Sequence, residues 1–478
     1  MRIQSVTWFF SIIITLTILC FIITPVHSQC LEDQKSLLLQ LKNGLQFDPD
    51  SSAKLVNWTQ SNDCCQWNGV TCDHFGRVIG LDLNTESISG GLNHSSSLFG
   101  LKFLQELNLA YNNFNSAQFP SSFGILTNLR HLNLSANNFS GSMASFKKSK
   151  NLNSIDLSHN ALTGSVPSIV FEGLSNLVFL SLMNNFFNGS IPSSLFSLPS
   201  MQQIWLSRNQ FSEISEFLPN KSMSTLDTLD LSQNKLRGPI PSYFFDFQSL
   251  SYLSLSFNNF SGTVQLESIH RLQNLTLLEL SHNSLLVNAS ISYSSLSSFP
   301  QLQWLGLASC KLQKFPPLMN QSLFYLDLSN NQISGVIPNW IWNIGNGSLN
   351  NFNLSCNLLV GLQRGYVIPP LQVLVLHSNQ LCGEIPIPPD STRFVDYSRN
   401  NFSSSIPAEI GNGILNLSYD QLVGMIPRGP QLQTFLETSF IGNKGLWGAP
   451  LTPCCKEVEP TTPTVDGRQS NTDEDGIN

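Results

Sequence analysis

The chain has 478 residues with 30 glycines and 25 prolines, and 41% of its residues are hydrophobic. Charged residues make up 12% and the net charge is −7, a balance that argues against nucleic-acid binding, which needs a basic face. The hydrophobic content excludes a wholly disordered chain. Length alone would suggest about three ordinary domains, unless one repeat array fills the chain.

The first residues are typical of a secreted protein. After a weakly basic start, Trp8 to Ile23 are almost wholly apolar, Pro25 breaks the run, and Val26 and Ser28 are small residues at the positions that a signal peptidase reads. This pattern predicts a signal peptide over residues 1–28. An N-terminal membrane anchor is the alternative, although a run of about 16 residues is shorter than the ~20 that span a bilayer.

A helix and a cysteine cluster are expected next. Leucines recur at helical spacing and Gly44 ends the pattern, which predicts a helix over residues 32–45. Four cysteines lie around this segment: Cys30, Cys64, Cys65 and Cys72. Because four cysteines allow three pairings, counting alone leaves their connectivity open.

A period of about 24 residues dominates the rest of the chain. The repeating pattern is Leu-x-x-Leu-x-Leu-x-x-Asn-x-Leu-x-Gly-x-Ile-Pro, preceded by a degenerate copy that holds Leu81 and Leu83. Its Asn position falls at residues 112, 137, 160, 185, 209, 234, 258, 283, 310, 331, 357, 379, 400 and 420, with Cys310 and Asp420 in place of Asn. The pattern therefore predicts about fifteen repeats.

Such a repeat predicts a solenoid. Each Leu-x-Leu forms a short strand with alternate side chains inward, and stacked copies make one parallel sheet over a continuous apolar core. The recurrent Asn lies where the chain leaves the strand. Its amide can bind backbone groups that would otherwise be buried without a partner, and Gly and Pro fix the next turn.

With these motifs the chain resembles the extracellular leucine-rich-repeat proteins of plants, namely receptor kinases and receptor-like proteins of the disease-resistance type. The resemblance covers residues 29–455. It implies an α/β leucine-rich-repeat solenoid, a curved parallel-sheet superhelix with two caps. The domains expected are an N-terminal cap at 29–75, repeats at 76–430, a C-terminal cap at 431–455 and an acidic disordered tail at 456–478.

The cap motifs carry disulfide expectations. The run from Cys64 to Cys72 matches the N-terminal cap of the family, and the resemblance implies Cys30–Cys64 and Cys65–Cys72 disulfides. Residues 442–451 resemble the C-terminal cap, but Trp447 stands where the family usually has cysteine. The pairing of the two cysteines that follow, Cys454 and Cys455, therefore stays open.

Three further cysteines lie inside repeats: Cys310, Cys356 and Cys382. We expect them to serve mostly as small buried groups. Cys356 falls at a predicted concave position and is the exception we expect.

The tail from Lys456 onward carries two basic and six acidic residues. In receptor-like proteins an acidic stretch here leads into a membrane helix, so the resemblance implies a member truncated before its transmembrane segment. We expect the product to be secreted into the apoplast, with the plasma membrane of its relatives as the alternative location.

No motif of an enzyme is present. The chain lacks the glycine-rich nucleotide loops, the zinc-protease and serine-hydrolase motifs and the kinase signatures, and its eight histidines show no metal-ligand spacing. We therefore expect neither catalysis nor a cofactor or metal, and we place function on the concave sheet.

Large side chains that would face outward from this sheet are the candidate ligand-binding residues. Aromatic residues and Arg bury much area at little entropic cost. The candidates are Tyr111, Arg130, His131, Phe179, Trp205, Arg208, Tyr252, Phe257, Trp304 and Tyr325; His159, Phe324 and Arg399 share the predicted face. Trp205 with Arg208, and Tyr252 with Phe257, are the preferred patches. These side chains could instead pack on one another or lie under glycans.

Fourteen Asn-x-Ser/Thr triplets are candidate glycosylation sites, and sugars would also solubilise a chain with few charges. They begin at Asn57, Asn93, Asn133, Asn138, Asn188, Asn220, Asn259, Asn274, Asn288, Asn320, Asn346, Asn353, Asn401 and Asn416.

The resemblance implies a ligand-binding ectodomain. Its ligand would be an extracellular peptide or a microbial protein in plant immunity or development. Signalling would pass through a partner leucine-rich-repeat receptor kinase, or the chain would act as a soluble decoy. The alternative from another class is a secreted inhibitor of a cell-wall-degrading enzyme, similar to the polygalacturonase inhibitors.

Overall fold

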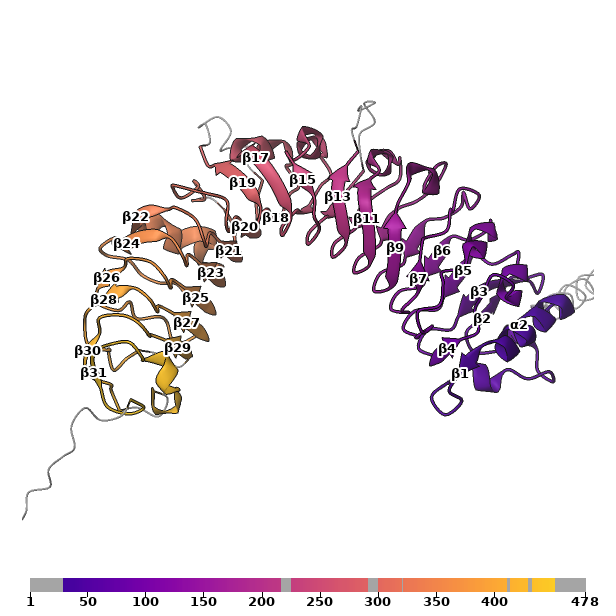
Figure 1. Cartoon of the computed structure of the whole chain (residues 1–478), viewed down its shortest axis with the longest axis horizontal. Coiled ribbons are helices and arrows are strands. Elements are labelled where there is room, and N and C mark those ends of the chain that lie inside the picture. The colour runs from indigo at the N-terminus through magenta and orange to yellow at the C-terminus, as the bar shows by residue number, and fades with distance from the viewer. Residues whose placement is uncertain are drawn as a thin grey trace, which may run out of the picture.

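The computed structural model describes residues 29–215, 225–290, 300–319, 321–410, 413–428 and 432–451, apart from the side chains of Asn346 and Gln433. These residues form an arc of stacked coils (Figure 1). The predicted signal peptide, the acidic tail and the pair Cys454 and Cys455 lie outside the described residues. Among the described residues, no helix is long and apolar enough to cross a membrane.

One sixteen-stranded sheet follows the inner side of the arc (Figure 1). Its first strand, β2, is antiparallel to β3, and every later strand is parallel to its neighbours. In order the strands are β2 (Val70–Cys72), β3 (Val78–Asp82), β5 (Glu106–Asn108), β6 (His131–Asn133), β8 (Ser154–Asp156), β10 (Phe179–Ser181), β12 (Gln203–Trp205), β14 (Thr228–Asp230), β16 (Tyr252–Ser254), β18 (Leu277–Glu279), β20 (Trp304–Gly306), β21 (Tyr325–Asp327), β23 (Asn351–Asn353), β25 (Val373–Val375), β27 (Phe394–Asp396) and β29 (Ile414–Asn416). The predicted α/β solenoid of about fifteen repeats is confirmed.

Further strands lie outside this sheet and pair within small sheets of two to four strands. They are β1 (Gln46–Phe47), β4 (Ile88–Gly90), β7 (Ser140–Gly141), β9 (Ala161–Ser165), β11 (Phe186–Ile191), β13 (Gln210–Ile214), β15 (Arg237–Gly238), β17 (Asn259–Gln265), β19 (Ser284–Asn288), β22 (Ser334–Ile337), β24 (Leu358–Leu362), β26 (Cys382–Gly383), β28 (Asn401–Phe402), β30 (Val423–Met425) and β31 (Gly445–Trp447).

Segments of 3₁₀ helix, three to nine residues long, complete the coils. They are η1 (Leu55–Asn57), η2 (Cys64–Gln66), η3 (Ser97–Gly100), η4 (Ser121–Ile125), η5 (Ser168–Val170), η6 (Ser193–Ser197), η7 (Ser242–Asp246), η8 (Leu266–Arg271), η9 (Asn339–Gly347), η10 (Leu432–Thr434) and η11 (Glu437–Ser439).

The strand leucines build the core. Leu229 on β14 pairs in register with Ile204 and Leu253 on the adjacent strands, and all three are fully buried. Because every repeat places a leucine or its equivalent at this register, stacking produces a continuous apolar column. A parallel sheet of three-residue strands has little pairing energy of its own, so we attribute its cohesion mainly to this burial.

The recurrent Asn, called the ladder residue below, joins neighbouring repeats by hydrogen bonds. Asn234 donates from Nδ2 to the carbonyls of Leu231 and Ser232 in its own repeat and of Leu206 in the preceding one, at 3.0–3.2 Å. Its Oδ1 accepts from the amide of Phe211, 3.1 Å away. The same pattern recurs along the array, for example at Asn258. The predicted ladder is confirmed.

The ladder also has terminal members that the sequence analysis did not identify. In the degenerate first repeat, buried Glu86 occupies the position, and its carboxylate accepts from Ser52 Oγ and from the amides of Lys54 and Leu55 in the N-terminal cap. At the other end, Asn443 donates to the carbonyl of Leu417 and accepts from the amide of Leu422. Repeat geometry thus reaches into the predicted C-terminal cap.

Cys310 and Asp420 stand in the ladder as predicted. Buried Cys310 lies 3.6–3.8 Å from the carbonyl oxygens of Ala308 and Leu280, and burial raises the pKa of its thiol to about 12. Asp420 accepts through Oδ1 from the amides of Asn400 and Phe402, while its buried Oδ2 has no partner.

The N-terminal cap closes the first repeat. Helix α2 (Glu32–Gly44) ends at Gly44, one residue before the predicted end. The structure contains the Cys30–Cys64 and Cys65–Cys72 disulfides, the pairing that the resemblance implied. Trp58 and Trp67 stack in the cap core with ring centroids 5.2 Å apart. Together these contacts cover the apolar edge that a terminal repeat would otherwise expose.

The expectation for the cysteines inside repeats needs one correction. Cys310 is buried and Cys356 is exposed, as expected, but Cys382 is also exposed. Cys382 follows buried Leu381, but both residues of β26, Cys382 and Gly383, are exposed, so its thiol lies at the surface.

Removing one ladder amide should open the array locally. We expect Asn234→Ala to lower the free energy of unfolding by about 2–3 kcal/mol, because it leaves buried carbonyls and one amide unpaired. Hydrogen exchange should quicken at the amide of Phe211. Gln233→Ala is the matched control, since Ala136 occupies the same position of another repeat at the same φ of 53°. Equal exchange and equal melting in the two variants would contradict this role.

Asp420 should make stability depend on pH. Burial is the main cause that raises the pKa of Asp420 to about 7 from its ordinary 3.8, and nearby Asp396 adds to it. The pKa of Asp420 is higher in the folded chain than in the unfolded chain. Its stabilising contribution to the free energy of unfolding is therefore fully present below about pH 4 and is lost as pH rises through 7. The loss amounts to as much as about 4 kcal/mol. Between pH 4 and pH 8, the melting temperature of the wild-type chain should fall relative to that of Asp420→Asn. Parallel melting curves across that range would refute the assignment.

Candidate ligand-binding face

Two rows of side chains line the inner sheet. The face row consists of the residues six and four positions before each ladder residue, on the strand itself. The edge row consists of the residue immediately before each ladder residue. On β14, for example, Thr228 and Asp230 belong to the face row and Gln233 to the edge row.

The edge row has an unusual backbone conformation. In the fifteen repeats whose ladder residues run from Glu86 to Asp420, its residue has a φ between 52° and 61° and is never glycine, whereas Gly442, at 88°, precedes the terminal ladder residue Asn443. A left-handed residue is unfavourable by roughly 1–2 kcal/mol, and here it turns the next residue, the ladder amide, into the core. The edge row therefore accommodates side chains of many sizes, from Ala136 to Phe257, and these project away from the core.

The acidic and amide residues of the face row support the backbone. The side-chain oxygens of Asp156, Asp230 and Asp327 each accept from the amide of the serine two positions on, at 2.8–2.9 Å. This short turn satisfies an amide that leaves the strand without a partner. Carboxylates thus recur on the concave sheet for a structural reason, and each keeps a second oxygen.

The structure places all ten candidate residues on these rows or beside them. Tyr111, Arg208 and Phe257 are in the edge row, Arg130 directly precedes the face row, and the others lie in the face row. The exposed candidates are Tyr111, Arg130, His131, Arg208 and Phe257, and the half-buried ones are Phe179, Trp205, Tyr252, Trp304 and Tyr325. His159, Phe324 and Arg399 are exposed as well.

The ring contacts differ from the patches selected from the sequence. Trp205 contacts Tyr252, with ring centroids 5.4 Å apart, and Phe257 stacks on His282 at 4.3 Å. Arg208 and Phe257 belong to the edge row, whereas Trp205 and Tyr252 belong to the face row. The rings therefore pair across repeats within one row.

Trp205 and Tyr252 form a cover over β14. Their strands, β12 and β16, lie on either side of β14, which separates them by roughly 9.6 Å. Because the ring centroids are only 5.4 Å apart, the two side chains lean toward each other above β14. Beneath them Thr228 and Asp230 are each 6% exposed, whereas the equivalent Asp327 is half-buried. Burial raises the pKa of Tyr252 to about 12, with further effect from the carboxylates of Asp230 and Glu279.

A second aromatic pair holds a carboxylate. Trp304 and Tyr325 stack with centroids 3.7 Å apart and an interplanar angle of 7°. Trp304 Nε1 donates to Glu279 Oε2 at 3.0 Å, and the amide of Ser281 donates to Oε1 at 3.2 Å. The carboxylate lies over Gly306, where a Cβ would overlap both of its oxygens. Burial, followed by the charges of Asp327 and Glu279, raises the pKa of Tyr325.

We call this group the aromatic–acidic patch. It comprises Trp205, Asp230, Tyr252, Glu279, Trp304, Tyr325 and Asp327. None of its carboxylates takes part in the five ion pairs found among the described residues. Arg208 is the only Lys or Arg on the two rows from β12 to β21.

Candidate glycosylation sites leave this patch open. Asn133, Asn353 and Asn416 lie in the face row and use Oδ1 to accept from their own serines. No other described acceptor is in either row, so the face row has none from β8 to β21. The exposed acceptors elsewhere are Asn57, Asn93, Asn138, Asn188, Asn259, Asn274 and Asn401. Asn288 is half-buried, and Asn220, Asn320 and the side chain of Asn346 lie outside the described residues.

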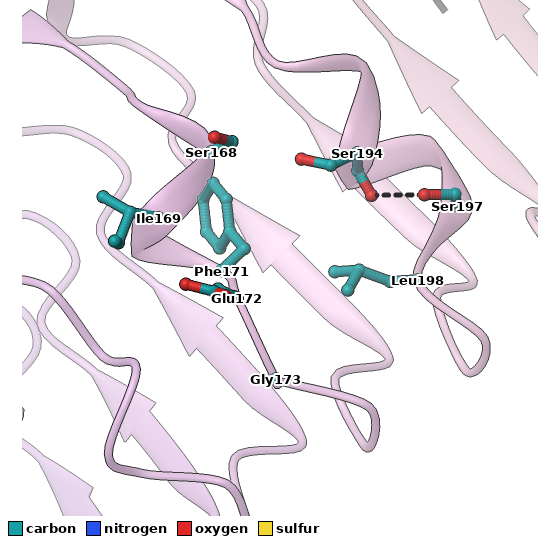
Figure 2. Close-up of a pocket in the computed structure, with 8 residues that line it drawn as sticks. All are labelled: Ser168, Ile169, Phe171, Glu172, Gly173, Ser194, Ser197 and Leu198. Carbon is teal, nitrogen blue, oxygen red and sulfur yellow. Dashed lines mark hydrogen bonds between the residues drawn. The ribbon is translucent and has the colours of Figure 1, made fainter. Parts of the chain in front are cut away.

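Several hollows lie away from the patch. Arg130 and His131 border a polar one of about 480 Å³ with Asn153 and Asn176. Figure 2 shows another, of about 470 Å³, between η5 and η6. Its one charged residue, Glu172, pairs with Lys147, so this hollow presents no catalytic arrangement of polar groups.

Sequence analysis missed the carboxylates of the patch. Only large aromatic and basic side chains were predicted to contact a ligand. The recurrence of Asp, Asn or Glu four residues before the ladder position, at Asp156, Asp230, Glu279 and Asp327 for instance, was the signal that could have found them.

Comparison with protein families identifies the repeats and the first cap. Residues 31–73 match the leucine rich repeat N-terminal domain. Residues 103–126, 128–148, 151–172, 199–260 and 322–344 match leucine rich repeat families.

Similar proteins include plant receptors. Receptor-like protein 7 of Arabidopsis thaliana is 42% identical over 121 residues, which are 25% of this chain and 12% of that protein. Receptor-like protein Cf-9 of Solanum pimpinellifolium is 36% identical over 111 residues, 20% of this chain and 13% of that protein. The matches thus span about an eighth of these relatives.

Solved structures share the fold. The crystal structure of PEPR1–AtPEP1 superposes with a TM-score of 0.64 at 28% identity, covering 84% of this chain and 60% of that one. The plant peptide hormone receptor RGFR1 in complex with RGF2 gives a TM-score of 0.53 at 25% identity, covering 74% and 57%.

Proposed function

We propose that this chain, a leucine-rich-repeat protein related to plant receptor-like proteins, is an extracellular ectodomain that binds a peptide or an extended protein segment on its concave face. Recognition would serve plant immunity or development. Because the chain contains no kinase motif, we assign signalling to a partner receptor kinase, or to sequestration of the ligand by the chain itself.

The observation that carries this proposal is the stretch of the inner sheet that bears the paired aromatic rings and has no described glycosylation acceptor in its face row. Between β8 and β21 the face row holds Trp205, Tyr252, Trp304 and Tyr325 and no described glycosylation acceptor. Rings that are half-buried and held by one another lose little entropy when a ligand covers them. The similarity to the plant peptide hormone receptor RGFR1, solved in complex with RGF2, supports a peptide as the class of ligand.

The geometry favours an extended ligand. The strands from β12 to β21 are six neighbours in the sheet, and at about 4.8 Å per strand they span roughly 24 Å, the length of about seven extended residues. A ligand crossing them would meet a new face-row side chain at each strand. Specificity would then arise from the order of side chains along the array.

Peptide display tests the proposal. The secreted full-length protein from plant cells is immobilised, random peptides are selected on it, and affinities are measured by calorimetry. We expect Trp304→Ala and Tyr252→Ala to weaken the selected peptides at least tenfold, because these rings would form the centre of the contact. Ile169→Ala, at an exposed residue of η5 (Figure 2) that belongs to neither row, should leave affinity unchanged.

Selection of no peptide at all would contradict the proposal. So would peptides that tolerate both concave variants and lose affinity only in Ile169→Ala. Melting curves equal to wild type would show that each variant folds.

A further inference from the structure

We propose that the aromatic–acidic patch selects a basic ligand, specifically an extended peptide with an arginine side chain seated between Glu279 and Asp327 on the Trp304–Tyr325 stack. This inference rests on the proposed function and names the chemistry of its ligand. Three features of the patch carry it: charge without a counter-charge, the fixed position of one carboxylate, and the aromatic stack beside it.

The first feature is charge without a counter-charge. Asp227, Asp230, Glu279 and Asp327 lie on or directly beside the face row between β12 and β21, and none forms an ion pair among the described residues. Arg208, in the edge row, is the only Lys or Arg there. Asp230 is 6% exposed and is partnered by the amide of Ser232 alone. Ionised carboxylates so arranged attract a cation.

The second feature is the fixed position of Glu279. Its two oxygens each accept one hydrogen bond, from Trp304 Nε1 and the amide of Ser281, and each retains a free lone pair. Gly306 leaves the space that the carboxylate occupies. A carboxylate held in one orientation suits the two parallel N–H groups of a guanidinium, which form a bidentate pair.

The third feature is the stack beside that carboxylate. Trp304 and Tyr325 are stacked face to face, with an interplanar angle of 7° and ring centroids 3.7 Å apart, so a ligand can contact the outer face of the stack. Glu279 and Asp327 flank Gly306, two residues along the strands from these rings. Asp327 Oδ1 accepts from the amide of Ser329, and the phenol of Tyr325 lies 3.5 Å from Oδ2. A planar guanidinium packs on such a surface with its N–H groups directed at the flanking carboxylates. Arginine therefore fits better than lysine, whose ammonium is compact and strongly hydrated.

The Trp205–Tyr252 pair suggests a second contact. Buried Asp230 behind these rings makes the potential of their outer faces more negative, which strengthens attraction of a cation. From β14 to β20 there are three strand intervals, about 14 Å or roughly four extended residues. A ligand with two arginines about four residues apart would engage both ring pairs.

The probe is a synthetic peptide of alanine and serine with arginines at positions i and i+4. Two companions replace both arginines by lysine or by glutamine. Calorimetry with the secreted full-length protein should give an affinity for the arginine peptide at least tenfold above the glutamine peptide, with lysine between them. Added salt should weaken binding, because charge pairs at an open surface are screened.

Two variants examine the carboxylate. Glu279→Gln removes the charge, and Gly306→Ala retains every charge but displaces the carboxylate; each should weaken the arginine peptide about tenfold. Glu213→Gln is the matched control, because Glu213 is an exposed carboxylate on β13 that pairs with Arg237 away from the patch. Equal melting curves would show that the variants fold.

Equal affinities for the arginine and glutamine peptides would overturn the inference, as would equal effects of Glu279→Gln and Glu213→Gln. The failure of the proposed function looks different. If displayed peptides bind the concave face and lose affinity in Trp304→Ala but are neutral or acidic, the receptor function stands and the basic ligand is refuted. If no peptide binds that face, both are refuted.

Discussion

The hydrogen-bond ladder is the interaction on which the rest of the structure depends. A solenoid coil must turn out of its strand at every repeat, and each turn leaves carbonyl and amide groups facing an apolar core. One buried side chain per repeat satisfies them, as Asn234 does for Leu206, Leu231 and Phe211. Since leaving a buried polar group without a partner costs more than a hydrogen bond contributes, the requirement fixes this residue type through the array.

The ladder also determines what the concave face can present. Bringing the amide inward requires the residue before it to be left-handed, so every coil exposes one side chain at the edge of the sheet. In many repeats the amide that follows the strand donates to an Asp, Asn or Glu four residues before the ladder position, as the amide of Ser232 does to Asp230. Acidic groups therefore stand among the exposed residues for structural reasons. These carboxylates can also bind a ligand, because only one oxygen of each accepts a hydrogen bond from the backbone.

Much of this could be predicted from sequence because the repeat is periodic. Register, ladder and buried leucines follow from a pattern seen fourteen times, and the two substitutions in it, Cys310 and Asp420, were located by spacing alone. The two terminal ladder residues were not predicted because each departs from the pattern. Glu86 stands in place of Asn and binds the N-terminal cap, and Asn443 follows a copy of the repeat that lacks the strand leucines. The burial of Cys382 was predicted wrongly because both residues of β26 are exposed, so this position lies at the surface.

The contacts within the face could not be predicted in the same way. Residues close in sequence on one coil, such as Trp205 and Arg208, belong to different rows, whereas lateral neighbours are about 24 residues apart or more. Whether Trp205 leans toward Tyr252 depends on Thr228 and Asp230 between them being small enough to lie beneath the rings. Likewise, Glu279 takes its position because Gly306, one strand away, has no Cβ. The chemistry of the face thus arises from combinations of adjacent repeats, and a single substitution in one repeat can change what its neighbour presents to a ligand.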